Sequence, residues 1–267
     1  MRPRCATALV FSFLAAACSA ILLGCGGAGN DGRIVAPLVL AEESPAGIYS
    51  GTFTSASGAR PIAYQTVGLI SENHDVQFLL SFDAQRHYAG YVLVLGSDIS
   101  GLLFEYRGVY GRFFGIDGVS ETTFDGSVAE ADNIFADYSG PRDQGRIDLD
   151  YMAAYEAGSS LDRTAGIWAY SEASAGGAVY AITLDIDANG QIFGADSSGC
   201  IYSGQLSIID AHYNMYRAHV MIHNCGVLDG DYNGLATVSA LGIGQMERLR
   251  LGVSNDAIAF AGFFDKT

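Results

Sequence analysis

The stretch VYAITLDID, residues 179–187, alternates apolar and polar side chains with a period of two. Every second residue forms its apolar face: Tyr180, Ile182, Leu184 and Ile186. The stretch YRAHVMI, residues 216–222, repeats the alternation. This period is typical of a strand with one buried face in an antiparallel sheet. Runs of this kind continue from Pro45 to the end without a convincing amphipathic helix, so the sequence predicts an all-β fold.

The chain also matches itself. Four stretches of the first half have counterparts in the second half in the same order: AGIYSGTF at 46 with AGIWAYSE at 165, TVGLISENHDVQFLL at 66 with AITLDIDANGQIFGA at 181, HYAGYVLVL at 87 with IYSGQLSII at 201, and FDGSVA at 124 with YNGLAT at 232. The shared order favours an internal duplication over chance similarity between glycine-punctuated strands. Each copy holds about eight short strands, which suits a small barrel or a sandwich. We expect two tandem antiparallel domains, residues 46–158 and 163–267, joined near Tyr155–Arg163.

The charge balance is acidic, with 29 Asp and Glu against 14 Lys and Arg and a net charge of −15 at pH 7. Lys266 is the only lysine. Such a surface argues against binding nucleic acid or anionic lipid through a basic patch. It is compatible with cationic ligands or partners.

Residues 1–24 have the layout of an export signal, with two arginines before the apolar run ALVFSFLAAACSAILL. The residues LLG before Cys25 resemble the lipobox of bacterial lipoproteins. The resemblance implies cleavage before Cys25, a diacylglycerol thioether on its thiol and a fatty acyl group such as palmitate on the new amine. Two or three acyl chains anchor a protein stably in a lipid bilayer. The alternative is an ordinary secretory signal whose cysteine happens to lie near the cleavage site.

Residues 25–45, which begin CGGAGN, fit a lipidated cysteine followed by a flexible tether. Gly26 stands where an aspartate would retain a lipoprotein in an inner membrane. The lipoprotein resemblance therefore implies the outer membrane of a Gram-negative cell envelope.

The body of the chain resembles uncharacterised proteobacterial lipoproteins. The resemblance rests on a glycine–aromatic opening strand (GIY, GIW), on GLISEN and YAG, and on the later SSGCIYSG and NMY. It implies location and architecture and leaves activity open. GIW at 166–168 is also similar to the opening strand of lipocalins, which implies a barrel that carries a small apolar ligand.

Two cysteines remain once Cys5 and Cys18 leave with the signal and Cys25 takes the lipid. In an oxidising compartment Cys200 and Cys225 are most simply a disulfide. A metal-binding or redox thiol pair is the alternative, but no clear ligands lie nearby and the spacing is not Cys-x-x-Cys.

The stretch DIDANGQIFGAD, residues 185–196, is the best candidate for a metal site. Its oxygen-bearing side chains follow the spacing of a calcium loop: Asp185, Asp187, Asn189 and Asp196. The flanks are strands, however, where such a loop needs helices. The competing interpretation is a hairpin whose turn uses Asp and Asn side chains and positive φ at Gly190. We favour the hairpin and expect no bound metal.

Two other stretches were considered for chemistry. His219 and His223 share a strand face with Arg217, and we expect them to be solvated because the arginine would repel a cation. In FEYRGVYGRFFG, residues 104–115, we expect core aromatics with Arg107 and Arg112 pointing outward.

The sequence contains no convincing nucleophile elbow, P-loop or dinucleotide-binding motif, so we expect no catalytic residues and no cofactor. The first functional hypothesis is a non-enzymatic structural or interaction module of the envelope with a protein partner. The second is a lipocalin-like carrier of a small apolar ligand, and the third is an envelope hydrolase.

Overall fold

The computed structural model describes residues 43–58, 60–81, 84–173, 179–240 and 246–267. The predictions for the signal peptide, Cys25 and most of the tether lie outside these ranges. From residue 43 onwards the described residues belong to one compact unit. No helix within the described ranges is long and apolar enough to cross a membrane.

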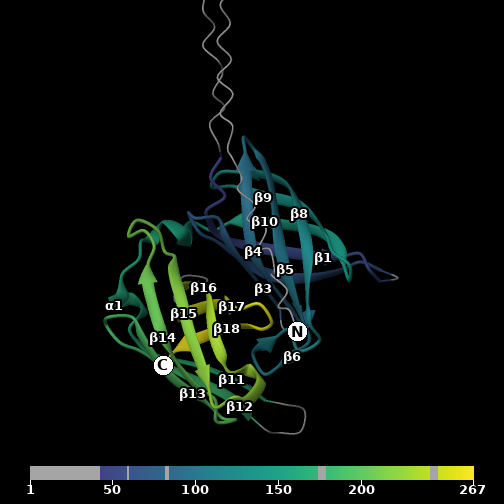
Figure 1. Cartoon of the computed structure of the whole chain (residues 1–267). Coiled ribbons are helices and arrows are strands. Elements are labelled where there is room, and N and C mark those ends of the chain that lie inside the picture. The colour runs from purple at the N-terminus through teal and green to yellow at the C-terminus, as the bar shows by residue number, and fades with distance from the viewer. Residues whose placement is uncertain (1–42, 59, 82–83, 174–178, 241–245) are drawn as a thin grey trace, which may run out of the picture. The chain divides into compact units, whose positions relative to one another are not determined.

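The first half of the chain forms a closed antiparallel barrel of eight strands. Its strands are β1 (Gly47–Ser55), β2 (Ile62–Ile70), β3 (Asp75–Leu80), β4 (Arg86–Leu95), β5 (Asp98–Arg107), β8 (Val119–Ala129), β9 (Asn133–Ser139) and β10 (Gln144–Tyr151). Around the barrel they follow the order β1, β10, β9, β8, β5, β4, β3, β2 (Figure 1). We call this the first barrel.

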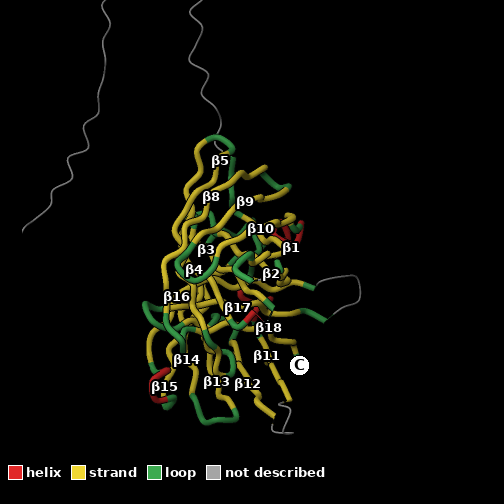
Figure 2. The backbone as a smooth tube through the Cα atoms, turned by 90° about the vertical axis from the view of Figure 1, so that its right-hand side faces the viewer, coloured by secondary structure: helices red, strands yellow, loops and turns green. Residues whose placement is uncertain are grey.

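The second half forms another closed barrel of eight strands, which we call the second barrel. Its strands, in chain order and in barrel order, are β11 (Gly166–Ala173), β12 (Val179–Ile186), β13 (Gln191–Asp196), β14 (Ile201–Ile208), β15 (Tyr216–His223), β16 (Gly230–Ser239), β17 (Arg248–Ser254) and β18 (Ala259–Lys266). Short helices lie between the barrels, η2 (Ala153–Ala157) and α1 (Leu161–Thr164), and before β16, η3 (Gly226–Leu228). The backbone trace in Figure 2 separates the strands of the two barrels.

The prediction of an all-β fold with two tandem barrels is confirmed. All four matched stretches fall on corresponding strands: β1 with β11, the hairpin β2–β3 with β12–β13, β4 with β14, and β8 with β16, each the sixth strand of its barrel. The pairing register is shifted by one residue from the sequence match, because Gly47 pairs with Ile70 and Gly166 with Ile186, whereas the match sets Ile70 against Asp185. The duplication in sequence is thus a duplication of the barrel.

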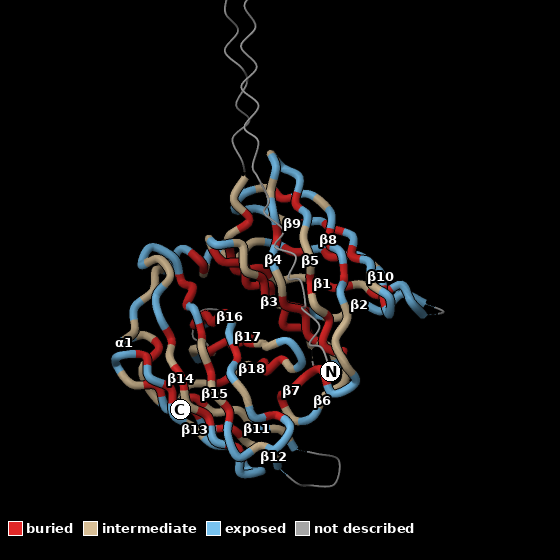
Figure 3. Tube along the Cα trace, in the orientation of Figure 1, coloured by how far each residue is buried: buried red, intermediate tan, exposed pale blue. Residues whose placement is uncertain are grey.

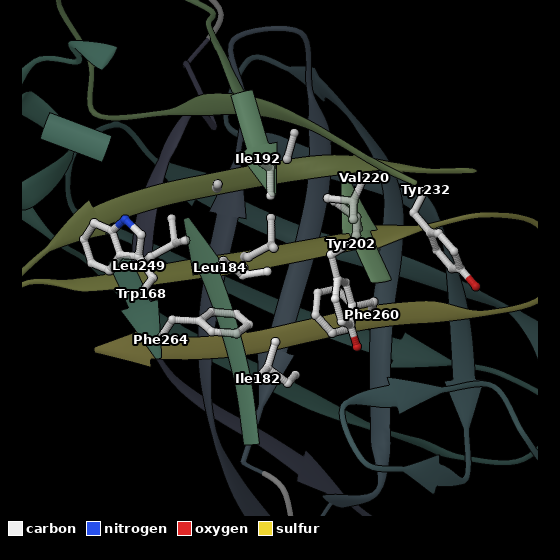
Figure 4. Packing of buried hydrophobic residues seen from close by; sticks show 14 of the residues in the cluster. Trp168, Ile182, Leu184, Ile192, Tyr202, Val220, Tyr232, Leu249, Phe260 and Phe264 are labelled. Carbon is white, nitrogen blue, oxygen red and sulfur yellow. The ribbon is translucent and has the colours of Figure 1, made fainter. Parts of the chain in front are cut away.

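Alternation along the strands sends apolar side chains into each barrel. In the first barrel the ring of Phe53 lies 4.9 Å from that of Tyr88 and 5.2 Å from that of Phe78, measured between centroids. In the second barrel Ile182, Leu184 and the other predicted inward residues are buried around Trp168 and Phe260 (Figure 4). Both interiors are therefore filled by side chains.

A third apolar cluster lies between the barrels. It joins Leu69, Leu79 and Ala89 of the first barrel to Leu235 and Ala261 of the second. Strand β3 is buried on both faces as a result, and it is red along most of its length in Figure 3. One face of β3 lines the first barrel and the other packs against β16 and β17.

Between β5 and β8 the chain leaves the first barrel and completes the wall of the second. It forms β6 (Val109–Tyr110) and β7 (Phe113–Phe114), which pair with each other. Strand β7 then pairs with the start of β18, opposite Ala259 and Phe260. The seam between β11 and β18 is paired only at two positions near the other end of β18. Strand β7 therefore extends the second barrel where its own strands diverge.

The prediction that Arg112 points outward is wrong, because this residue lies buried at the seam. Its Nε donates to the carbonyl of Ala261 on β18 at 2.9 Å, and its Nη1 to the hydroxyl of Tyr170 on β11 at 3.3 Å. The guanidinium also lies 4.7 Å from the centre of the Tyr170 ring, a favourable cation–π distance. Arg112 lies in the turn between β6 and β7, and this position brings it to its partners on β18 and β11. Its neighbours in sequence do not indicate these partners.

Candidate functional site

One end of each barrel is closed by the aromatic residue of the GIY or GIW motif. Tyr49 donates its hydroxyl hydrogen to the carbonyl of Pro45 at 3.0 Å, and the indole nitrogen of Trp168 donates to the carbonyl of Thr164 at 2.7 Å. Each acceptor lies four residues before its donor, and both aromatic side chains are fully buried. The motif is thus a plug that fixes the incoming chain beneath the barrel.

The other end of the first barrel is closed by a buried carboxylate. Asp143 accepts hydrogen bonds from Ser55 at 2.8 Å and Tyr138 at 3.0 Å, and also from Ser57 and Arg86. Burial alone would raise the pKa of Asp143, but the hydrogen bonds from the two serines and the charge of Arg86 lower it below its usual value. The carboxylate is therefore ionised at neutral pH, and both of its oxygens accept hydrogen bonds from these side chains.

A second carboxylate lies beside it. Glu105 accepts from Arg107 at 2.8 Å and from Tyr88 at 3.1 Å, and its Oε1 lies 3.5 Å from the guanidinium of Arg86. Because Arg86 also bonds Asp143, the arginine bridges the two acids. Buried charges are tolerated when they are paired and hydrogen-bonded in this way.

The corresponding end of the second barrel carries Asp196. One oxygen accepts from Tyr180 and Tyr202 at 2.9 Å each, and the other from the backbone amides of Ser198 and Cys200. Burial would raise the pKa of Asp196, but hydrogen bonds, first from the Ser198 hydroxyl at 2.7 Å and then from Tyr202 and Tyr180, lower it. Tyr202 matches Tyr88 of the first repeat. At this end of each barrel the aligned buried tyrosine donates a hydrogen bond to a carboxylate, Tyr88 to Glu105 and Tyr202 to Asp196.

The predicted disulfide between Cys200 and Cys225 is present. It joins the start of β14 to the loop after β15, beside Asp196. These three residues are also the cluster of potential metal ligands in the described ranges. The sulfurs are bonded to each other and Asp196 accepts from five donor groups, the Ser198 hydroxyl included, so the cluster seals the barrel end.

The residues of the calcium hypothesis do not converge. Asp187 bonds the amides of Asn189 at 2.8 Å and Gln191 at 2.9 Å, and Gly190 has φ +81°, as in a tight hairpin turn. Asp196 lies at the end of β13 that is farther from this turn. At about 3.3 Å per residue, it is roughly 17 Å from Gln191 at the near end. Asp185 faces outward within β12. The geometry is that of the hairpin interpretation.

The histidines of β15 also face outward. His219 is 3.6 Å from Asp231 on the neighbouring strand, and Arg217 is 3.9 Å from Asp75 of the first barrel. Met221 shares this face, and His223 is exposed at the strand end. Arg217 thus makes a contact between barrels that the sequence pattern did not predict.

Several hollows lie on outer surfaces of the described residues. One of about 580 Å³ is lined by outward residues such as Thr54, Asp137 and Arg146. Another of about 290 Å³ lies between the barrels, with Ala89 and Phe104 on one side.

The closing networks at the barrel ends combine residues far apart in sequence, so no spacing motif indicates them. The aligned tyrosines, Tyr88 and Tyr202, are a sequence signal that could have indicated these networks.

The chain matches no protein-family model. Comparisons with curated proteins and with solved structures find no significant similarity.

Proposed function

We propose that this chain is a lipid-anchored interaction module of the bacterial cell envelope, without enzymatic activity. The observation that carries the proposal is that both barrels are filled by buried side chains and closed at both ends. A carrier needs an internal cavity of several hundred Å³ with a few convergent polar groups. The filled interiors favour the outer surface as the part of the molecule that binds.

The state of the buried acids supports a non-enzymatic role. A general acid or base needs a proton to exchange with a bound substrate. Glu105 and Asp143 instead accept from arginine, tyrosine and serine side chains that hold them in place. Asp196 is held in the same manner. These carboxylates act as structural centres of the barrel ends.

The anchor rests on the LLG–Cys25 motif. Residues 25–42 separate the proposed lipid from the described body, and a flexible segment of that length spans roughly 25 Å. A double or triple acyl anchor would keep the barrels close to the bilayer, at an average separation of this order.

The anchor is tested by Cys25→Ala. We expect the variant to lose incorporation of labelled palmitate and to leave the membrane fraction. Cys18→Ala, a cysteine inside the signal, is the matched control and should still be labelled. Unchanged labelling of Cys25→Ala would refute the anchor. Protease accessibility on intact cells then reports which face of the membrane carries the barrels.

A further inference from the structure

The outer face of β4 carries an uncovered apolar stripe. Inward residues such as Tyr88 and Val92 belong to the core of the first barrel. The alternate residues Tyr91, Leu93 and Leu95 point outward, and 48%, 60% and 77% of their surfaces are exposed. We call these three residues the β4 stripe.

The β4 stripe continues the interface between the barrels. Ala89, the preceding outward residue, is buried in the cluster that joins them, and Phe104 on β5 packs against the same cluster. The crevice of about 290 Å³ between the barrels is lined by both residues. Beyond this crevice the second barrel no longer covers β4. An apolar surface continuous with an established interface is typical of a protein-binding site.

The second repeat shows that the barrel does not require this stripe. The alignment of HYAGYVLVL with IYSGQLSII places Gln205 opposite Tyr91 and Ser207 opposite Leu93. The inward positions remain alike, with Leu206 opposite Val92. At these two positions the outer face of the strand is apolar in the first repeat and polar in the second, whereas the third stripe residue, Leu95, aligns with Ile209.

The register explains why the stripe stands free. Strand β3 pairs with β4 only as far as Asp75 opposite Tyr91, and β4 runs on to Leu95. The described chain begins nearby, where the amide of Glu43 donates to the carbonyl of Gly96 at 3.0 Å. The stripe is therefore flanked by β5 on one side; on the other, the amide of Val92 donates to the carbonyl of His74 at 3.1 Å and Glu43 contacts the tip.

Acidic side chains surround the stripe. On the same outer face the paired rows place carboxylates on β3, β5, β8 and β9: Asp75, Asp98, Glu121, Asp125 and Asp137. The cations beside them are Arg217, which contacts Asp75, and Arg146, which contacts Asp137. The local charge is negative, as is that of the whole chain.

We propose that the β4 stripe is a docking surface for a basic polypeptide segment that carries apolar side chains. This inference rests on the proposed function and names the chemistry of its partner. Apolar side chains of the partner bury Tyr91, Leu93 and Leu95, and its lysines or arginines lie against the surrounding carboxylates. The same carboxylates oppose an anionic lipid surface, because like charges repel across a few ångströms.

The test uses the exported chain in phosphatidylcholine nanodiscs and a fluorescent peptide in which lysine and leucine alternate. We expect the peptide to bind, and added salt to weaken the binding. A double variant, Tyr91→Gln with Leu93→Ser, installs the residues of the second repeat. It should weaken binding about tenfold or more, since two central contacts are lost. Peptides that alternate lysine with serine, or glutamate with leucine, should bind about tenfold more weakly.

The matched control is a double variant on the outer face of the second barrel, Phe193→Ser with Ile201→Ser, since both residues are also exposed. It should bind the peptide like the unaltered chain. Equal binding by the two double variants would overturn the proposal. The proposal would also be overturned if the β4-stripe variant still bound the peptide and lost only self-association, or only binding to phosphatidylcholine vesicles.

A third outcome concerns the chain itself. The apolar segment IVAPLVLA, residues 34–41, ends two residues before Glu43. If the peptide binds only after this segment is deleted, the segment is the occupant and the proposal is refuted. If Cys25 carries no lipid, the same assay runs on the soluble exported chain, so failure of the anchor and failure of docking remain separate results.

Discussion

His87 has no exposed surface and lies where the two barrels meet. Its Nε2 is 2.7 Å from the amide oxygen of Gln77, so the neutral ring donates there. The other nitrogen, Nδ1, has no hydrogen-bond partner within the described ranges. Burial, and then the positive charge of Arg112, lower the pKa of His87 to about 3.

Because of His87, we expect the folded chain to begin losing stability at a higher pH than the one at which ordinary carboxylates titrate. The unfolded chain takes up the proton near pH 6.5, whereas the folded chain resists it down to about pH 3. Stability is therefore fully present above pH 6.5 and falls as the pH decreases, by up to roughly 1.4 kcal/mol per pH unit. Urea unfolding at pH 7.5, 6 and 5 measures this slope.

His87→Gln should remove most of the slope, while His223→Gln, which replaces an exposed imidazole, should leave it in place. The depressed pKa values of Asp143 and Asp196 act in a lower window: their stabilisation is present above about pH 4 and is lost below it. A flat profile between pH 7.5 and 5 in the unaltered chain would contradict the role given to His87.

Arg250 is a buried charge on β17. Its Nη1 donates to the hydroxyl and the carbonyl of Ser239, but Nε and Nη2 have no hydrogen-bond partner in the part of the chain that the structure describes. Burial, and then the nearby Arg248, lower its pKa to about 10, so it remains charged at neutral pH. A buried charge without a carboxylate is costly to fold around.

We expect Arg250→Met to raise the free energy of unfolding by about 1–3 kcal/mol, because the stem still packs and the desolvation cost disappears. Arg248→Met is the control, since it removes a charge that is partly exposed and paired with Asp265 at 2.7 Å. Chemical denaturation of both variants measures the difference. Destabilisation by Arg250→Met would mean that the bonds to Ser239 outweigh the unpaired nitrogens.

At the scale of single elements, the loop closed by Cys200 and Cys225 restrains the end of the second barrel that has no aromatic plug. The cysteines are 25 residues apart in sequence. In the chain-entropy description, cross-linking a loop of this size stabilises by about 3 kcal/mol. We expect Cys200→Ala with Cys225→Ala to lose roughly this amount, measured by urea unfolding under oxidising conditions. Addition of a reductant should shift the unaltered chain toward the variant, and insensitivity to reductant would contradict the prediction.

The strands themselves follow from the sequence because each needs only its own alternation. The inward positions of β12 and β15 were predicted residue by residue, as at Leu184 and Val220. Strand β4 shows the limit, since YVLVL is apolar at every position and does not tell which face is buried. Only the register with β3 and the position of the second barrel decide it.

The candidate sites were harder to predict for a related reason. The disulfide followed from a count of cysteines, but the network around Asp143 joins residues from β1, β4 and β9. Arg112 was assigned outward because its neighbours are aromatic. Its partners Tyr170 and Ala261 are supplied by the other repeat, far along the chain. Contacts of this range leave no local pattern.

At the scale of the whole molecule, β7 makes the barrels energetically dependent on each other. Phe113 is buried in the core of the second barrel, 5.2 Å from Phe260 between ring centroids. We expect Phe113→Ala to cost about 3–5 kcal/mol, the usual range for a buried phenylalanine. The loss should also speed hydrogen exchange in β18, which belongs to the other repeat.

Tyr110→Ala is the matched control, because Tyr110 lies on the same hairpin and is exposed. It should change neither the unfolding transition nor exchange in β18. If Phe113→Ala destabilises β8 and leaves β18 untouched, the two barrels are not coupled through this strand.

The partnership of β7 with β18 also has a consequence for biosynthesis. The receiving strand comes last among the described strands, and it closes the second barrel against β11 as well. During synthesis the first barrel is made before the partners of Phe113 and Arg112, which stay uncovered until residues 260 and 261 have followed. Without β18, both the hairpin and the seam beside β11 would stay uncovered. The contacts of β7 therefore form late in synthesis, after most of the second barrel has been made.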